Sequence, residues 1–159
     1  MKRALALLLM VTSAPAGVLA APAGPAPAPP AQQVIQEKKV NPKHLTHRVV
    51  RKLAHEAAGE HKRVLVAFGA DWCVACALID PVFKREENRA LFRDWELVRV
   101  DVDTLPEGPV LGIPFDTIPF FMKLDGDGHV AGTLLGSDVL EGRGRPQDVD
   151  AAFARFLGT

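Results

Sequence analysis

One stretch of eighteen residues, 64–81, constrains this chain more than any other part of it. It reads VLVAFGADWCVACALIDP: an apolar run suited to a buried strand, then Gly69, then a helical pattern from Cys73 onwards. Both cysteines of the protein, Cys73 and Cys76, lie at the junction of the expected strand and helix. Two thiols at the N-terminus of a helix that follows a strand indicate thiol–disulfide exchange.

The spacing of the two cysteines suits that chemistry. Residues at positions i and i+3 of a first helical turn face the same way and lie within reach of one disulfide. The unpaired N–H groups and partial positive charge of a helix N-terminus favour the thiolate, which is the attacking form. We therefore expect Cys73, nearer the strand and more exposed, to be the nucleophile, and Cys76 to be the resolving thiol.

Other uses of a cysteine pair fit the sequence less well. A structural disulfide that closes so short a loop would stabilise the fold little by the entropic route. A zinc site would need four ligands, and the sequence has no second CxxC and no His–Cys set near the first, so we expect no metal site. Copper(I) could use two thiolates alone, so a copper-binding or non-catalytic partner-binding module stays open as an alternative.

The N-terminus predicts an export signal at residues 1–20. Two basic residues open the chain, an apolar run follows at 4–11, and a stretch of small residues ends at Ala20, directly before Ala21. Cleavage there would place the protein in the periplasm or another extracytoplasmic space; an uncleaved membrane anchor is the alternative. Export matters because a dithiol outside the cytosol meets an oxidising environment.

The remaining chain is expected to divide into a linker at 21–40 and one folded domain at 41–159. The segment 21–31 holds five prolines in eleven residues, which favours an extended, polyproline-like spacer. Hydrophobic residues at 48% and charged residues at 24% are typical of a globular protein. The formal net charge is zero, so no overall basic character indicates a nucleic-acid partner.

Hydrophobic periodicity in the domain predicts alternating helices and strands. Asn41 and Pro42 predict the start of an amphipathic helix that ends near Gly59. The later expected elements are strands at 96–102, 118–124 and 129–135, a loop at 137–145, and a last helix opening at Pro146. This order, a βαβ unit and then a ββα unit, predicts an α/β three-layer sandwich with a central mixed β-sheet and helices on both faces.

Residues from about 60 to 157 resemble the thioredoxin family in element order and in the placement of motifs. Trp72, Cys73 and Cys76 form a WCxxC string similar to the family's active site. Pro81 matches the proline that kinks the family's active-site helix. The resemblance implies a thioredoxin-like fold and a redox-active disulfide, with no other cofactor.

Two further features extend the resemblance. Thr117, Ile118 and Pro119 are similar to the family's loop whose proline is cis and lies against the disulfide, and Gly136 matches a family glycine. A cis proline would leave the Ile118 backbone free to pair with an extended substrate. The string 70–76, ADWCVAC, is closer still to the C-terminal domain of the periplasmic thiol:disulfide interchange protein DsbD. That domain passes electrons from a membrane partner to exported acceptors.

The site departs from the family in its handling of protons. Thioredoxins usually keep a buried acid six residues before the first cysteine, where it takes a proton from the second thiol. Here that position is Ala67, which cannot accept a proton from Cys76. Asp71 and Asp80 are the candidates that could serve instead, through water.

The surroundings of the first sulfur favour a reductant. The residue after the second cysteine is Ala77 rather than a basic residue, and Val74 and Ala75 leave no histidine between the cysteines. Without an added cation the Cys73 thiolate is less stabilised and the disulfide harder to reduce. We therefore expect an exported, monomeric thiol–disulfide oxidoreductase that reduces exported protein disulfides. Its electron donor would be a thiol, for which a membrane protein is one candidate; a disulfide oxidant stays open as an alternative.

Overall fold

The structure, a computed structural model, describes residues 34–41, 43, 45–105, 108–114, 116–141 and 145–158. The predicted export signal at 1–20, and the predicted linker as far as residue 33, lie outside the described residues. No helix in the described ranges is both long enough and apolar enough to cross a membrane.

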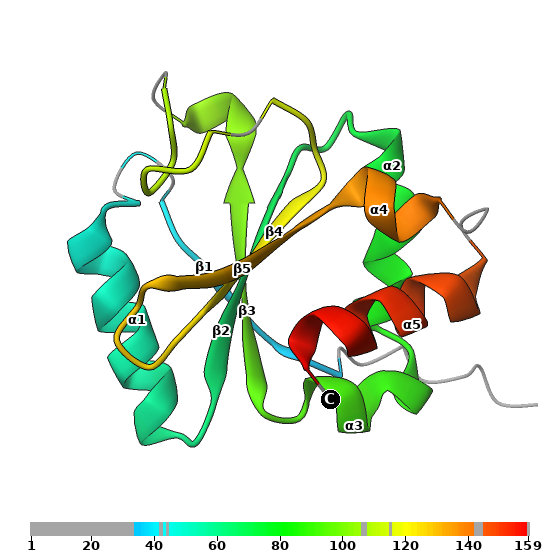
Figure 1. Cartoon of the computed structure of the whole chain (residues 1–159), viewed down its shortest axis with the longest axis horizontal. Helices are drawn as coiled ribbons and strands as arrows, with labels where there is room; N and C mark the ends of the chain where they lie inside the picture. Colours follow the sequence, from blue (N-terminus) through cyan, green and yellow to red (C-terminus); the bar gives the residue numbers. More distant parts are fainter. Residues whose placement is uncertain are drawn as a thin grey trace, which may run out of the picture.

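Five strands form one mixed sheet, in the order β1-β3-β2-β4-β5 (Figure 1). The strands are β1 (Gln36–Lys39), β2 (Arg63–Gly69), β3 (Trp95–Asp101), β4 (Phe120–Leu124) and β5 (Val130–Leu135). β1 and β2 run parallel to β3, whereas β4 is antiparallel to both β2 and β5. The central strand β2 is buried on both faces, as its continuous apolar run predicts.

Helices cover both faces of the sheet (Figure 1). α1 (His47–Gly59) packs on one face through Val50, Leu53 and neighbouring alanines. The other face carries α2 (Val74–Ile79), α3 (Arg89–Phe92), α4 (Gly136–Leu140) and α5 (Pro146–Leu157). The predicted three-layer α/β sandwich is confirmed.

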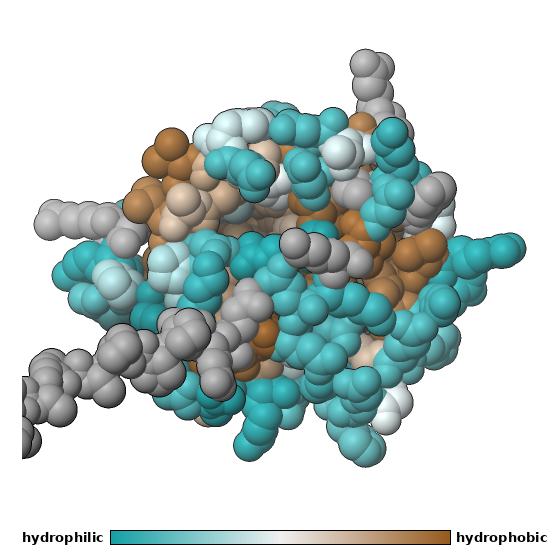
Figure 2. Space-filling view, turned by 180° about the vertical axis from the view of Figure 1, so that it is seen from behind, coloured by the Kyte–Doolittle hydropathy of each residue, from teal (hydrophilic) through white to brown (hydrophobic). Residues whose placement is uncertain are grey.

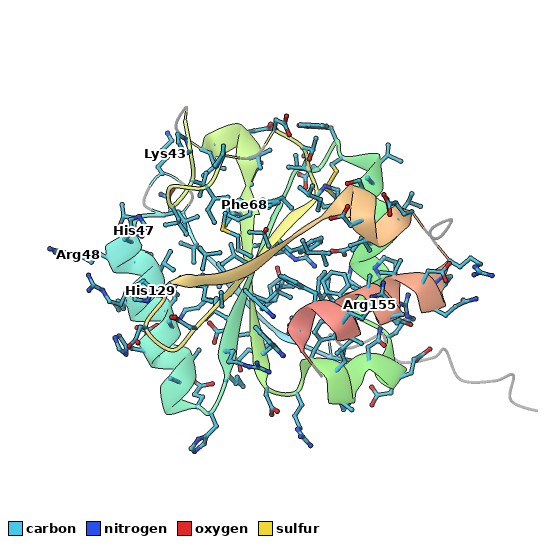
Figure 3. The ribbon with its side chains drawn as sticks, in the orientation of Figure 1. Lys43, His47, Arg48, Phe68, His129 and Arg155 are labelled. Carbon is cyan, nitrogen blue, oxygen red and sulfur yellow. A yellow bond between two sulfur atoms is a disulfide. The ribbon has the colours of Figure 1, made fainter. Side chains whose placement is uncertain are left out.

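Side chains divide between these layers and the surface. Phe68 lies in the layer under α1, where its ring centroid is 5.8 Å from that of Phe120 (Figure 3). His47 and Arg48 are exposed on the outer side of α1. The view from behind shows a mostly hydrophilic surface with apolar areas, one of them over α2 at the upper left (Figure 2).

The folded domain begins earlier than position 41, so the predicted linker end at residue 40 is wrong. Val34 and Ile35 are buried, and the backbone N–H of Val34 donates to the carbonyl of Phe83 at 3.1 Å. β1 follows directly and pairs with β3 along one side only. Its sequence, QEKK, has no apolar alternation, because a short strand at the sheet edge can remain polar.

Two other predicted boundaries are corrected. The first helix starts at His47 rather than at Asn41, because the Thr46 hydroxyl caps it and accepts a hydrogen bond from the Val49 N–H at 3.4 Å. Pro42 lies outside the described residues. The predicted loop at 137–145 begins instead as α4, which a buried Val139 holds against the core.

Candidate active site

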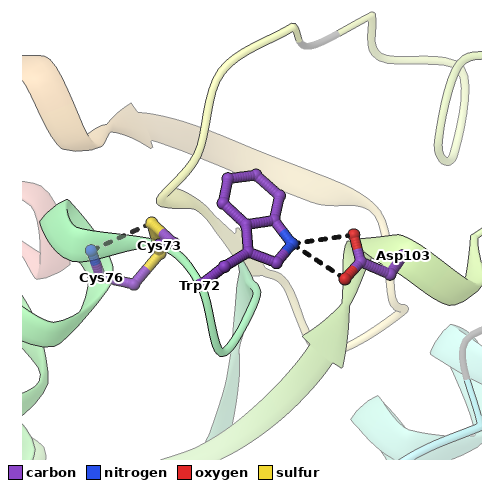
Figure 4. The surroundings of a disulfide bond; sticks show 4 residues. All are labelled: Trp72, Cys73, Cys76 and Asp103. Carbon is purple, nitrogen blue, oxygen red and sulfur yellow. Dashed lines mark hydrogen bonds between the residues drawn. A yellow bond between two sulfur atoms is a disulfide. The ribbon is translucent and has the colours of Figure 1, made fainter.

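The turn that follows β2 delivers both cysteines to the start of α2. Cys73 is the N-cap of α2 and forms a disulfide with Cys76, with a Cα–Cα distance of 5.2 Å (Figure 4). The Cys73 sulfur also accepts a hydrogen bond from the backbone N–H of Cys76 at 3.1 Å. That donor would stabilise a thiolate on Cys73 once the disulfide is reduced. At Asp80 the α-helix gives way to a tighter 3₁₀ turn that contains Pro81.

The prediction that Cys73 is the more exposed cysteine is wrong for this oxidised form. Cys73 is only 6% exposed, whereas Cys76 is half-buried. Cys73 turns its sulfur back over the first turn of α2, toward the helix N–H groups that it caps. The Cys76 sulfur lies against the end of β2, where a Cβ on Gly69 would come within 3.1 Å of it. Gly69 therefore makes room for the second cysteine.

The proline loop lies beside the disulfide. The Ile118–Pro119 peptide bond is cis, as the resemblance implies, and Pro119 lines the same cavity as both cysteines. The Gly136 N–H donates to the Pro119 carbonyl at 2.7 Å, and a Cβ on Gly136 would come within 2.5 Å of the proline ring. Thr117 is exposed and Ile118 is half-buried, so the Ile118 backbone lies close enough to the surface for the substrate pairing predicted for it.

Trp72 lies between the disulfide and Asp103, which belongs to the short 3₁₀ turn directly after β3 (Figure 4). Its indole N–H donates to both carboxylate oxygens of Asp103, at 2.9 and 3.2 Å. The sequence interpretation missed Asp103. Its position after β3 was a usable signal, because the carboxyl ends of the parallel strands β2 and β3 meet at one sheet edge.

Asp80 is held by two cations rather than poised to accept a proton. Its carboxylate accepts a hydrogen bond from Lys84 at 2.6 Å and pairs with Arg99 at 2.5 Å. Burial raises the pKa of Asp80, but the hydrogen bonds and charges of Lys84 and Arg99 outweigh it and hold that pKa below its usual range. An acid that stays ionised in this way is a weak acceptor for a thiol proton. Asp71 is exposed in the turn before Trp72.

A cavity of about 450 Å³ lies beside the disulfide, and its lining includes Ala67, Cys76, Asp80 and Arg99. Ala67 is paired in register with Arg99 of β3, so a cation stands next to the strand position where the family resemblance implies an acid. The period-two alternation of β3 could have identified Arg99, which the sequence interpretation overlooked. In the part of the chain that the structure describes, no three His, Cys, Asp or Glu residues cluster as a metal site would require.

Comparison with known proteins decides the family. The thioredoxin family model matches residues 45–136, more than half of the chain. This chain belongs to the thioredoxin family. It is therefore a thioredoxin-like redox protein whose CxxC pair, Cys73 and Cys76, forms a disulfide. The family resemblance seen in the sequence is confirmed, while the closer likeness to DsbD stays a prediction.

Individual relatives agree with this membership. A thioredoxin of Mycoplasmoides gallisepticum is 33% identical over 98 residues, which cover 59% of this chain and 87% of that protein. Thioredoxin H2-1 of Oryza sativa subsp. japonica is 35% identical over 77 residues, which cover 48% of this chain and 53% of that protein. Among solved structures, a disulphide isomerase from Xylella fastidiosa Temecula1 superimposes with a TM-score of 0.50 at 26% identity. That match covers 68% of this chain and 88% of the isomerase.

Proposed function

We propose that this protein is an exported thiol–disulfide oxidoreductase that reduces disulfides in other exported proteins. The observation that carries the proposal is the Cys73–Cys76 disulfide at the N-terminus of α2, beside the Pro119 loop and the exposed Trp72. The N-terminal pattern at 1–20 supports export. The reducing direction is supported by the small, uncharged residue Ala77 after the second cysteine.

The reaction proceeds through a mixed disulfide. The Cys73 thiolate attacks one substrate sulfur, forms a new S–S bond and releases the other substrate sulfur, which takes up a proton. The Cys76 thiolate then attacks the Cys73 sulfur and releases the second substrate thiol. The substrate gains two electrons and two protons, and the protein returns to the Cys73–Cys76 disulfide.

Two more electrons must reach that disulfide before another cycle. An oxidising extracytoplasmic space offers no obvious thiol pool, so a dedicated dithiol protein is the donor class that we propose. The likeness of residues 70–76 to the C-terminal domain of DsbD favours a donor embedded in the membrane.

The strand position where the family resemblance implies an acid offers no carboxylate for the proton on Cys76, although the exposed Asp71 and Asp101 also line the cavity. Ala67 supplies none, and the Asp80 carboxylate is paired with Lys84 and Arg99. We therefore propose that solvent entering the cavity takes this proton, so that resolution is slow at neutral pH and speeds up as pH rises.

Insulin reduction and equilibration with glutathione test the proposal together. Wild-type protein should reduce insulin, Cys73→Ser should not, and Cys76→Ser should accumulate a mixed disulfide with the substrate. A reduction potential near that of thioredoxin, about −270 mV, supports a reductant, whereas one near about −120 mV would make the protein an oxidant. Insulin reduction by Cys73→Ser at the wild-type rate would overturn the mechanism. Tight stoichiometric copper(I) binding with negligible reduction would favour the binding module instead.

A further inference from the structure

An exposed apolar patch adjoins the disulfide. The large apolar side chains that stay exposed in the described chain are Trp72, Val74 and Leu78, at 65%, 76% and 59%. Val74 and Leu78 are four residues apart on α2 and so share one helix face, while Trp72 directly precedes the first cysteine. The hydropathy view shows apolar surface over α2 with hydrophilic surface around it (Figure 2). We call Trp72, Val74 and Leu78 the apolar centre. An exposed apolar patch beside a reactive disulfide suits a docking surface for a protein.

Aspartates border the Trp72 side of the apolar centre. Asp71 directly precedes Trp72 and is exposed. Asp103 accepts the hydrogen bond from the Trp72 indole, and Asp101 in turn accepts one from the Asp103 backbone N–H at 3.1 Å. Asp101 and Asp103 are both exposed, so their carboxylates face solvent next to the site.

The proline-loop side is also acidic. Asp116 is exposed three residues before Pro119. Asp138 is exposed on α4, two residues after the Gly136 that contacts Pro119, and α4 contacts α2. The acidic rim is the set of five aspartates around the apolar centre: Asp71, Asp101, Asp103, Asp116 and Asp138.

Most cations of the described chain lie elsewhere on the molecule, although Arg155 lines a hollow together with Asp138 of the rim. The two cations that line the cavity beside the disulfide, Lys84 and Arg99, are both paired with Asp80 rather than with the rim. Residues 38–63 contain eight Lys and Arg against two Asp and Glu, whereas residues 64–159 contain nine against sixteen. Most of 47–59 forms the exposed surface of α1, on the face of the sheet opposite α2 (Figures 1 and 3). The molecule therefore has a basic side and an acidic redox side.

We infer that this redox side docks protein partners whose cysteines are flanked by Lys and Arg. The inference rests on the proposed thiol–disulfide exchange and adds the chemistry of the partner. The apolar centre accommodates an apolar side chain next to the partner's sulfur, while the acidic rim attracts the flanking cations. Complementary charge of this kind acts mainly on the association rate and weakens as salt screens it.

Three cyclic disulfide peptides that differ only in two flanking residues, Lys, Ser or Glu, test the inference with the full reduced chain. We expect kcat/KM for the Lys peptide to exceed that for the Glu peptide by about tenfold at low ionic strength. The ratio should shrink to about twofold near 1 M salt, where the screening length is about 3 Å. Equal rates for the three peptides, or a faster Glu peptide, would overturn the docking inference and leave the proposed function standing. Failure to reduce any peptide would instead count against the proposed function.

Variants locate the effect on the surface. Asp116→Asn combined with Asp138→Asn should bring the low-salt ratio of Lys to Glu peptide rates down to about threefold or less. The matched control, Arg48→Gln combined with Arg51→Gln on α1, removes two charges on the basic side and should change that ratio by less than about twofold. An equal loss in both double variants would contradict recognition by the acidic rim.

Discussion

At the scale of single residues, the redox site is distinguished by Ala67, which has no carboxylate at the position where the family resemblance implies one. No carboxylate projects from this position of β2 into the cavity, and its cross-strand neighbour Arg99 pairs with Asp80 and Glu37. The Asp80 carboxylate that lines the cavity comes from the 3₁₀ turn after α2 rather than from the strand, and its charge is already paired. We therefore expect proton removal from the second thiol to depend on solvent.

Restoring the missing acid tests that dependence. Ala67→Asp should place a carboxylate beside Cys76 and speed the collapse of the mixed disulfide at pH 7 by about tenfold or more, because a positioned base assists proton transfer. Stopped-flow release of a fluorescent substrate between pH 6 and 9, chosen as roughly the range around a thiol pKa, measures the step. In Ala67→Asp, the rate of mixed-disulfide collapse should rise much less with pH than it does in the wild-type protein. An unchanged pH profile would show that Cys76 deprotonation does not limit resolution.

The paired Asp80 carboxylate leads to a separate prediction, which concerns the stability of the fold. Its pKa lies below the usual value because the hydrogen bonds and charges of Lys84 and Arg99 outweigh the opposing effect of burial. The ionised group thus stabilises the fold above the ordinary Asp pKa of about 3.9, and this contribution is lost as pH falls through the folded-state pKa. Asp80→Asn should lower the free energy of unfolding by about 1 kcal/mol at pH 7.

Urea unfolding of the oxidised protein at pH 7 and in acid measures the difference. The gap between wild type and Asp80→Asn should close in acid, once Asp80 is protonated in both the folded and unfolded states. Asp71→Asn serves as the control, since Asp71 is an exposed turn residue and its change should stay within about 0.5 kcal/mol. A gap that persists in acid would indicate lost packing rather than lost charge.

At the scale of elements, short segments fix the site. β2 and β3 bring two strand ends together, and α4 presses its first residue, Gly136, onto Pro119. This contact places α4 against the proline loop and therefore beside the disulfide. The tightness of the contact leaves no space for a side chain.

Gly136→Ala should accordingly displace the loop. The added Cβ would lie 2.5 Å from the Pro119 Cγ and 2.8 Å from its carbonyl oxygen, so ring or backbone must shift, and we expect a loss of about 1–3 kcal/mol. The midpoint temperature of thermal unfolding and the rate of insulin reduction should both fall. Gly59→Ala is the matched control, because nothing lies within 4 Å of its Cβ position, and it should be neutral or slightly stabilising. Equal effects of the two substitutions would contradict the close contact.

At the scale of the whole molecule, the domain extends to the N-terminal side of its first helix. Val34 and Ile35 join the core on the face of α2 and α5, and β1 completes the sheet beside β3. The chain from residue 34 to 40 thus ties both layers together before α1 begins. The acidic redox side and the basic side of α1 are also features of the whole molecule, because their opposite charges cancel in the net charge of zero.

Shortening the chain tests this boundary. A chain that begins at residue 41 loses two buried apolar side chains, worth about 1.5–3 kcal/mol each, together with the β1 hydrogen bonds. We expect its free energy of unfolding to fall by about 3 kcal/mol or more relative to a chain that begins at residue 32. Equal stability of the two chains would mean that β1 adds nothing to the fold.

Some of this architecture follows from local pattern. The strand–turn–helix at residues 64–81, the WCxxC string and the helix at Pro146–Leu157 carry strong signals, since apolar periodicity, turn glycines and helix-start residues act over a few positions. The same signals sufficed for the fold class and for the family. β1 and α4 carried none, because an edge strand and a single helical turn bury too little to impose a pattern.

The geometry of the site, in contrast, follows from tertiary contacts and not from local sequence pattern. The hydrogen bond from Trp72 to Asp103 joins residues 31 positions apart, and the ion pair of Asp80 with Arg99 joins the turn after α2 to strand β3. Local pattern identified the two cysteines and the tendency of their sulfurs to exchange. The partners of the neighbouring charges, the depth of Cys73 and the acidic rim were decided by tertiary contacts, because each depends on which distant residues the packed sheet brings together.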